Sequence, residues 1–279
     1  MTKYYLAVDI GASSGRLILG HLENGKMELE EVHRFENGMV KKDCELCWEF
    51  DRLFQEIKNG LKKCKEIGKI PVSMGVDTWG VDFVLMDKDD KVLGNTVGYR
   101  DHRNEGMDEE VYKTISLEDL YARTGIQKAI FNTVYQLMAV KTKHPEYLEQ
   151  AETMLHVPDY FHYLLTGKKT CEYTEATTGQ LVNAETKDWD YELIDKLGYP
   201  RKMFQKLIMP GTSVGHFTEE VKAEVGFDVE VVAPATHDTG SAVLAVPAND
   251  DDFIYISSGT WSLMGIEREK ADCSKKSCE

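Results

Sequence analysis

The N-terminal part of the chain alternates between apolar runs and tight turns, and this opening constrains the fold more than any other feature. An apolar run at 3–9 leads into the small-residue turn 11–15. A second run at 16–22 reaches the dipeptide Asn24-Gly25, a strong signal for a β-hairpin. Residues 27–35 then alternate with a period of two, as a strand does. The sequence therefore predicts a three-stranded antiparallel meander.

A helix and two further apolar runs follow the meander. Residues 50–67 place Leu53 and Ile57 on one face at helical spacing. The runs 71–76 and 81–86 are apolar enough to form buried strands. Hairpins join antiparallel strands, whereas a helical connection joins parallel ones. The combination predicts an α/β fold with a mixed sheet that is covered by helices.

The middle of the chain is expected to be mostly helical. Helices are predicted where segments end at a Gly or before a Pro, at 116–123, 133–143, 158–165 and 191–197. The remaining expected elements are strands at 212–217 and 229–233, a helix or buried segment at 239–246, and a strand at 253–257. The polar, acidic run 247–252 is the predicted boundary between a domain at 1–246 and a second one that begins at 253 and reaches residue 279.

Composition excludes several classes of partner. The 279 residues include 33 Lys and Arg against 48 Asp and Glu, a formal net charge of −15. Nucleic acids and anionic membranes both require a basic surface, so neither is an expected partner. There is no apolar stretch of transmembrane length and no signal-peptide pattern, which favours a cytoplasmic protein. Cys44 and Cys47 form a C-x-x-C without a second pair, which favours reduced thiols over a metal or redox site.

The turn between the first two strands is the first candidate site. Asp9 ends the first strand, and the residues after Ile10 and Gly11 are Ala12, Ser13, Ser14, Gly15 and Arg16. Glycine lets the backbone approach a ligand, and amides and hydroxyls can then point at phosphate oxygens. A carboxylate at a strand end can hold hydrated Mg²⁺. The run is neither a Walker A loop nor a dinucleotide fingerprint, and an ordinary hairpin turn is the commoner explanation of such a run taken alone.

Polar and aromatic residues interrupt the apolar strands at 77–83, the second candidate site. Trp79 beside Asp77 and Asp82 suits a sugar, because the ring can cover C–H faces while carboxylates bind hydroxyl groups. A corner or bulge that buries Trp79 in the core is the commoner explanation. The polar cluster 99–103 is equally consistent with a ligand-binding loop and a solvated loop.

The third candidate site lies at 235–242, between an apolar strand and a helix of small residues. Asp238 beside His237 is placed for general-base catalysis, and small neighbours would let a ligand come close. The start of the helix would also favour an anion. A simple N-cap role for Asp238 explains the spacing equally well.

Taken together and in order, these runs resemble the FGGY carbohydrate kinases. The resemblance covers the chain to about Ile266 and rests on residues 9–16, 75–83, 98–101, 125–127, 131–137, 158–161, 165–168, 172–178, 237–239 and 257–265. Within the family, the runs 77–83 and 257–265 are typical of members that act on L-rhamnulose.

The resemblance implies an actin-like, ribonuclease H-like ATPase fold, in which a mixed sheet is flanked by helices and two domains close on a sugar and ATP. It implies transfer of the γ-phosphoryl group of ATP to L-rhamnulose, with Mg²⁺ oriented by Asp9 and the sugar hydroxyl proton accepted by Asp238. The implied sugar contacts are Gly80, His237, Asp238 and Thr239. The implied phosphate contacts are Ala12, Ser13, Ser14, Gly15, Arg16 and Thr260. A kinase of fuculose or xylulose and a non-catalytic sugar-binding module are the alternatives.

The resemblance stops after Ile266. Residues 267–279 are charged, include two cysteines and show no apolar period. The second domain of the family would occupy a long stretch beyond this point. The expectation is therefore a complete first domain, a second domain only begun in a truncated or frame-shifted reading frame, and impaired kinase activity.

Overall fold

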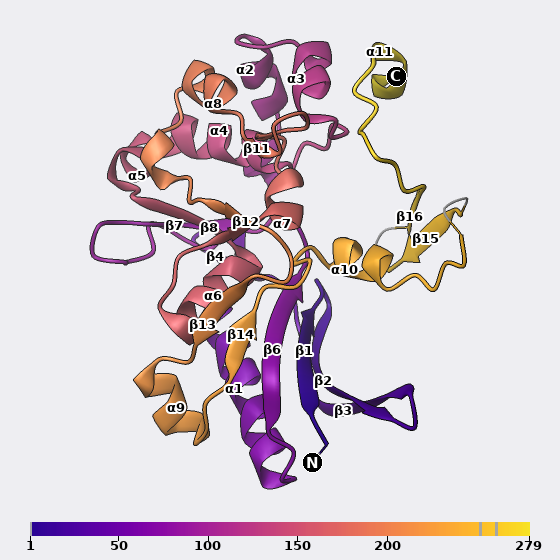
Figure 1. Cartoon of the computed structure of the whole chain (residues 1–279). Helices are drawn as coiled ribbons and strands as arrows, with labels where there is room; N and C mark the ends of the chain where they lie inside the picture. The colour runs from indigo at the N-terminus through magenta and orange to yellow at the C-terminus, as the bar shows by residue number, and fades with distance from the viewer. Residues whose placement is uncertain (1, 251–252, 260–261) are drawn as a thin grey trace.

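The computed structural model describes residues 2–250, 253–259 and 262–279, and its centre is a mixed sheet (Figure 1). The sheet has six strands in the order β13-β14-β6-β1-β2-β3. Their bounds are β1 Tyr4–Ile10, β2 Ser14–Glu23, β3 Lys26–Glu36, β6 Pro71–Thr78, β13 Ser213–His216 and β14 Glu230–Val232. Strand β6 is parallel to β1 and β14, whereas β1–β2, β2–β3 and β13–β14 are antiparallel pairs. The predicted meander and mixed sheet are confirmed.

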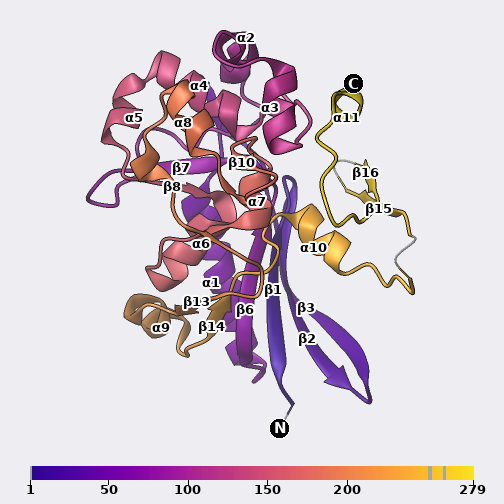
Figure 2. The ribbon, with the colours of Figure 1, turned by 45° about the horizontal axis from the view of Figure 1, so that its top comes forward.

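Helices cover one face of this sheet (Figure 2). They are α1 (Phe50–Glu66), α6 (Val157–Thr166) and α9 (Glu219–Val225). Ile57 of α1 and Phe161 of α6 are fully buried in one core with Val8 of β1 and Val76 of β6. The other face is more open, since Tyr5 on β1 is 45% exposed. Alternate residues of a strand point to opposite faces, so Asp9 lies on the open face with Tyr5.

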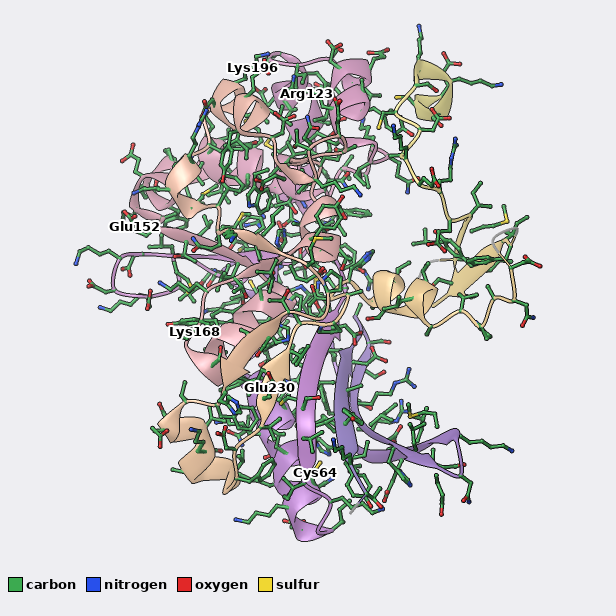
Figure 3. The ribbon with its side chains drawn as sticks, in the orientation of Figure 1. Cys64, Arg123, Glu152, Lys168, Lys196 and Glu230 are labelled. Carbon is green, nitrogen blue, oxygen red and sulfur yellow. The ribbon has the colours of Figure 1, made fainter. Side chains whose placement is uncertain are left out.

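A second, mostly helical part with its own core lies above the sheet (Figure 1). The predicted helices are confirmed in it as α3 (Leu117–Thr124), α4 (Thr133–Lys143) and α8 (Tyr191–Leu197), and the sequence missed α2 (Met107–Tyr112), α5 (Pro145–Gln150) and α7 (Tyr173–Thr177). Figure 3 shows Arg123 in this part, and its guanidinium bonds Asp190 at 2.7 Å. Cys64 lies at the opposite end of the molecule, on α1 (Figure 3).

The strand predicted at 81–86 does not extend the central sheet. Residues Phe83–Met86 form β7, which pairs with β8 (Thr153–His156) in a sheet of two strands. Between β6 and β7, Val81 takes a left-handed conformation with φ of 71°. This conformation is rare for a β-branched residue and turns the chain away from the sheet.

Short elements complete the fold. They are β4 Val40–Lys42, β5 Glu45–Cys47, β9 Cys171–Glu172, β10 Val182–Asn183, β11 Asp188–Trp189, β12 Leu207–Ile208, and the 3₁₀ turns His102–Asn104 and Arg201–Met203. No helix among the described residues is long and apolar enough to cross a membrane. All six cysteines are free thiols, and Cys47 of the C-x-x-C is buried in β5.

The C-terminal segment stands apart from both cores (Figures 1 and 2). It contains α10 (Asp238–Leu244), the antiparallel pair β15 (Tyr255–Ser258) and β16 (Ser262–Gly265), and α11 (Lys275–Cys278). Leu244 is 77% exposed, Ile256 67% and Met264 74%. The segment returns to the helical part, where the Tyr121 hydroxyl donates to the backbone oxygen of Asp272 at 3.2 Å. The domain boundary at 247–252 stays a prediction.

Candidate functional site

Asp9 lies at the carboxyl end of β1, where the small-residue turn begins. The register places it opposite Arg16 on β2 and opposite Asp77 on β6. Arg16 Nε donates to Asp9 Oδ2 at 2.9 Å. The turn is closed by a hydrogen bond from the Gly11 N–H to the Ser14 carbonyl oxygen at 2.9 Å. Ala12 to Arg16 therefore form a compact turn next to the Asp9 carboxylate.

Gly15 is required in this turn by packing. A Cβ at Gly15 would lie 2.2 Å from the ring of Phe35, which is buried in the main core. A Cβ at Gly11 would meet only the Ser14 carbonyl oxygen at an ordinary 3.5 Å. The side of Gly15 on which a Cβ would stand therefore faces the core, toward Phe35. Thr260, the expected phosphate contact from the second turn, lies outside the described residues.

The sequence suggested Asp77 only as a sugar-binding carboxylate beside Trp79, whereas the structure places it near the end of β6, directly beside Asp9. Burial raises its pKa well above the usual value, and the carboxylates of Asp9 and Asp238 raise it further. Among the described residues, no hydrogen bond or ion pair reaches its carboxyl group. An Asp near the carboxyl end of each of two adjacent parallel strands is the signal that could have identified this residue.

The chain brings His237 and Asp238 to the same end of the sheet. The Thr78 N–H donates to the Thr236 carbonyl oxygen at 2.9 Å, and an isolated parallel bridge joins Thr78 to His237. Asp9, Asp77 and Asp238 therefore gather at the carboxyl ends of β1, β6 and the segment after β14.

Asp238 is the first residue of α10, and its side chain is 39% exposed. Its Oδ1 accepts the Thr239 N–H at 2.5 Å and lies 3.6 Å from His237 Nε2. Burial lowers the pKa of His237, and the Asp238 carboxylate only partly offsets this effect. The N-cap of α10 is His237, so the simple N-cap role for Asp238 is wrong.

Trp79 belongs to the core. It is 6% exposed and its ring lies 4.0 Å from that of Trp48, centroid to centroid. Asp82 accepts from the indole N–H groups of both, at 2.9 and 2.6 Å, and from the Tyr99 N–H at 3.1 Å. The corner alternative is therefore the correct one. A Cβ at Gly80 would come within 2.9 Å of Thr178, so the corner also needs glycine.

The cluster 99–103 is divided, since Arg100 and His102 are exposed to solvent whereas Asp101 and Arg103 bond the surrounding fold. Asp101 accepts the Leu46 N–H and the Arg103 N–H, each at 2.7 Å. Arg103 Nη2 donates to Gln136 Oε1 at 3.1 Å.

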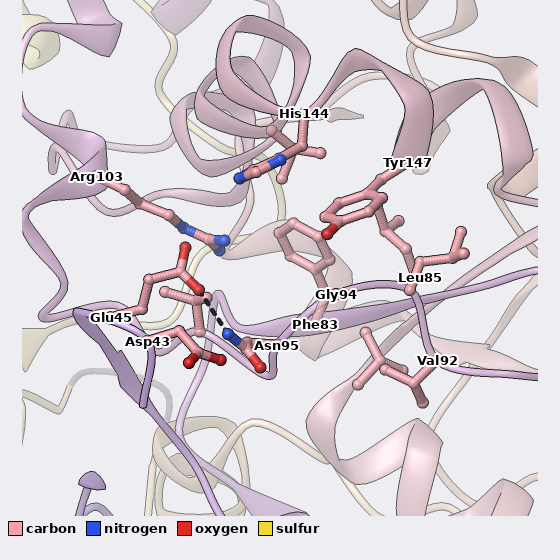
Figure 4. Close-up of a pocket in the computed structure, with 14 residues that line it drawn as sticks. Asp43, Glu45, Phe83, Leu85, Val92, Gly94, Asn95, Arg103, His144 and Tyr147 are labelled. Carbon is pink, nitrogen blue, oxygen red and sulfur yellow. Dashed lines mark hydrogen bonds between the residues drawn. The ribbon is translucent and has the colours of Figure 1, made fainter. Parts of the chain in front are cut away.

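A cavity of about 400 Å³ lies between the β4–β5 hairpin and helices α4 and α5 (Figure 4). Glu45, Arg103, His144 and Tyr147 point into it, and Asn95 donates to Glu45 at 2.9 Å. Phe83 and Arg103 from the candidate runs 77–83 and 99–103 line this cavity, but Asp9, Asp77 and Asp238 do not. It is therefore distinct from the carboxylates at the end of the sheet.

Another group of potential metal ligands is buried in the interior. Ligand atoms of His156, Asp159 and Cys171 lie within 4.8 Å of one another. A histidine that binds a metal normally donates its second ring N–H to an acceptor. His156 Nε2 has no such partner among the described residues. The group does not fit a metal site.

The fold of the chain is shared with sugar kinases of known structure. The chain superposes on a ligand-bound xylulose kinase from Lactobacillus acidophilus with a TM-score of 0.83, at 20% identity, over 94% of this chain and 54% of that one. A xylulose kinase from Rhodospirillum rubrum gives 0.84 at 18% identity, over 97% and 56%. At these identities the similarity shows the fold alone.

Sequence similarity extends further. Residues 4–245 match the N-terminal domain of the FGGY family of carbohydrate kinases, and the chain belongs to this family. It is 56% identical to a rhamnulokinase from Halalkalibacterium halodurans, over 99% of this chain and 59% of that protein. A rhamnulokinase from Oceanobacillus iheyensis is 52% identical, over 100% and 59%. The chain thus spans 59% of the length of these relatives.

Proposed function

We propose that the chain carries the sugar site and the proton acceptor of an ATP-dependent kinase that converts L-rhamnulose to L-rhamnulose 1-phosphate. The observation that carries the proposal is the gathering of Asp9 and Asp238 at one end of the sheet, on either side of Asp77. The substrate is inferred from the relatives, which are named rhamnulokinases at 56% and 52% identity.

Asp238 has the geometry of a general base. Its Oδ1 is bound by Thr239, so the proton acceptor is Oδ2, which no described residue bonds. As the primary hydroxyl oxygen of the sugar attacks the γ-phosphorus, its proton passes to Oδ2 and the bond from phosphorus to the β-bridging oxygen breaks. His237 is neutral because burial lowers its pKa, so it can donate to a sugar hydroxyl without neutralising Asp238. Positioning and charge stabilisation supply most of the rate in such reactions.

The phosphates of ATP are assigned to the turn from Ala12 to Arg16. Arg16 bonds Asp9 at 2.9 Å, and its side chain is 45% exposed, so the guanidinium is accessible to a phosphate oxygen. Asp9 and Asp77, whose carboxyl group bonds none of the described residues, fit hydrated Mg²⁺, which prefers carboxylates together with water and phosphate oxygens. When bound, the ion would neutralise negative charge on the phosphates.

Sugar binding without phosphoryl transfer is the second candidate function. It is favoured by the exposure of Leu244 on α10, Ile256 on β15 and Met264 on β16. No described segment covers these apolar side chains, which follow Asp238 in the chain. Catalysis in such kinases relies on closure that excludes water from the reacting phosphate.

One pair of measurements separates these functions. Calorimetry would compare L-rhamnulose, L-fuculose and D-xylulose, and a coupled assay would measure ADP release with Mg²⁺-ATP and each sugar. We expect L-rhamnulose to bind at least about tenfold more tightly than the other two, because binding differences of one or two hydrogen bonds have this size. Product formation identifies the kinase, and binding without product identifies the second candidate. Equal affinity for all three sugars, or none, contradicts the proposed substrate.

A further inference from the structure

Glu172 is a fully buried carboxylate that reaches the turn before Asp238. It ends β9 and caps α7, where the Thr174 N–H donates to its Oε1 at 2.9 Å. Its Oε2 accepts from Thr236, both from the backbone N–H at 3.0 Å and from the hydroxyl at 2.8 Å. Thr236 lies two residues before Asp238, so the carboxylate holds the segment that delivers the proposed base.

Thr174 extends this contact by one residue. Its hydroxyl donates to Glu172 Oε2 at 2.5 Å and accepts the His237 N–H at 3.3 Å. A threonine hydroxyl has one proton to donate and lone pairs to accept, so it can make both bonds at once. The chain of contacts thus runs from Glu172 through Thr174 to the backbone of His237.

These donors satisfy the buried carboxyl oxygens of Glu172. No lysine, arginine or histidine of the described residues pairs with it, and a buried carboxylate is tolerated only when hydrogen bonds replace its water. Helix capping alone would require the bonds to Thr174 and Glu175 but not those to Thr236, which is 64 residues away in the chain.

We propose that Glu172 and Thr174 are positioning residues that fix the backbone of Thr236 and His237, and thereby the direction of the Asp238 carboxylate and the His237 ring. The consequence for sugar binding rests on the proposed function. The effect of Glu172 and Thr174 on the backbone of Thr236 and His237 does not depend on the proposed function.

Two matched controls separate positioning from general stability. Thr177 lies on the same helix as Thr174, and its hydroxyl donates only within α7, to the Thr174 carbonyl oxygen. Asp190 is a buried carboxylate that caps α8, as Glu172 caps α7, but it pairs with Arg123 and makes no hydrogen bond to described residues of the turn. Thr177→Val and Asp190→Asn therefore remove a hydroxyl and a capping carboxylate that do not bond residues 236–238.

Amide hydrogen exchange of the 279-residue chain reports on the turn directly. Glu172→Gln and Thr174→Val are expected to speed exchange of the Thr236 and His237 amides at least about tenfold, relative to amides of α1, since hydrogen bonds to charged groups contribute this much or more. Thr174→Ser keeps the hydroxyl and should restore slow exchange. The two controls should leave these amides within about twofold of wild type.

Calorimetry with L-rhamnulose on the same proteins tests the consequence. Glu172→Gln and Thr174→Val should weaken binding about tenfold or more, whereas Thr174→Ser and both controls should not. Folded variants with unchanged exchange and unchanged affinity overturn the proposal, as do controls with equally large effects. If the wild-type chain does not bind L-rhamnulose, the proposed function and the role in sugar binding fail together, and the exchange rates still decide whether the two side chains hold the turn.

Discussion

Asp9 and Asp77 are direct neighbours on the parallel strands β1 and β6, and both lie on the open face of the sheet. Burial of Asp77, and after it the negative charge of Asp9, raises the pKa of Asp77 well above its usual value. A carboxyl group that the folded protein prefers to keep protonated opposes folding once the pH rises above its value in the unfolded chain.

Asp77→Asn should therefore stabilise the ligand-free protein at neutral pH. Each unit of pKa shift corresponds to about 1.4 kcal/mol, which for a chain of this size raises Tm by about 3 °C. The gain should shrink as the pH falls toward 4, because Asp77 is then increasingly protonated in the unfolded chain as well as in the folded protein. Thermal unfolding of both proteins at pH 7 and pH 4.5 measures this difference in Tm. A difference that does not depend on pH would contradict the explanation.

The same substitution removes one of the two carboxylates assigned to Mg²⁺. Titration of Mg²⁺-ATP should show weaker binding to the Asp77→Asn variant, while titration of L-rhamnulose should be nearly unchanged. Asp89→Asn, which alters an exposed carboxylate bonded to Lys88, serves as the control. Equal Mg²⁺-ATP affinity in all three proteins would exclude Asp77 from the metal site.

Asp238→Asn should abolish catalysis and spare sugar binding. The amide keeps the shape and the bond from Thr239 but cannot accept a proton from the sugar hydroxyl. General-base catalysis contributes at least about 10²-fold, so ADP release with L-rhamnulose should fall by that factor. The calorimetric Kd should stay within about threefold of wild type. Turnover close to that of wild type would remove Asp238 from the role of base.

Gly15→Ala should destabilise the fold. The added Cβ would lie 2.2 Å from the Phe35 ring, and overpacking of a core of this kind costs about 1–3 kcal/mol. Gly11→Ala is the matched control, since its Cβ meets an ordinary contact at 3.5 Å. Urea unfolding should show a loss for the first variant only, and Phe35→Leu should partly rescue it. A loss of ATP binding without a loss of stability would instead favour a role of Gly15 at the phosphates.

Local patterns predicted the elements well because their causes are local. The Asn24-Gly25 dipeptide and the period of two defined the meander, and glycines such as Gly125 and Gly167 ended helices in the left-handed conformation. Asp9 and Asp238 were found because a polar residue directly after an apolar strand is visible in the sequence.

The missed features depend on contacts between distant parts of the chain. Asp77 becomes unusual only when the register sets it beside Asp9, and Glu172 only when its strand packs against Thr236. The burial of Trp79 was the commoner expectation, but its partner Trp48, which packs against it from far away in the sequence, was not foreseen. Strand β8 pairs with β7 across the intervening helices, and no local period announces that pairing.

The last prediction concerns acid stability and His162. The Val76 N–H donates to His162 Nε2 at 3.2 Å, which joins β6 to α6, and this nitrogen can accept only while it carries no proton. Burial lowers the pKa of His162 to about 4. The unfolded chain therefore takes up this proton first, near pH 6.5, and the contribution of His162 to the free energy of unfolding falls as the pH drops from 6.5 to about 4.

Buried carboxyl groups with raised pKa values, such as Asp159 and Glu175, act in the opposite direction, so the comparison must be made between variants. His162→Gln retains an acceptor for Val76 but does not titrate, and urea midpoints measured between pH 7 and pH 4 should fall less steeply for this variant than for wild type. Parallel curves for the two proteins would show that His162 is not the group that titrates.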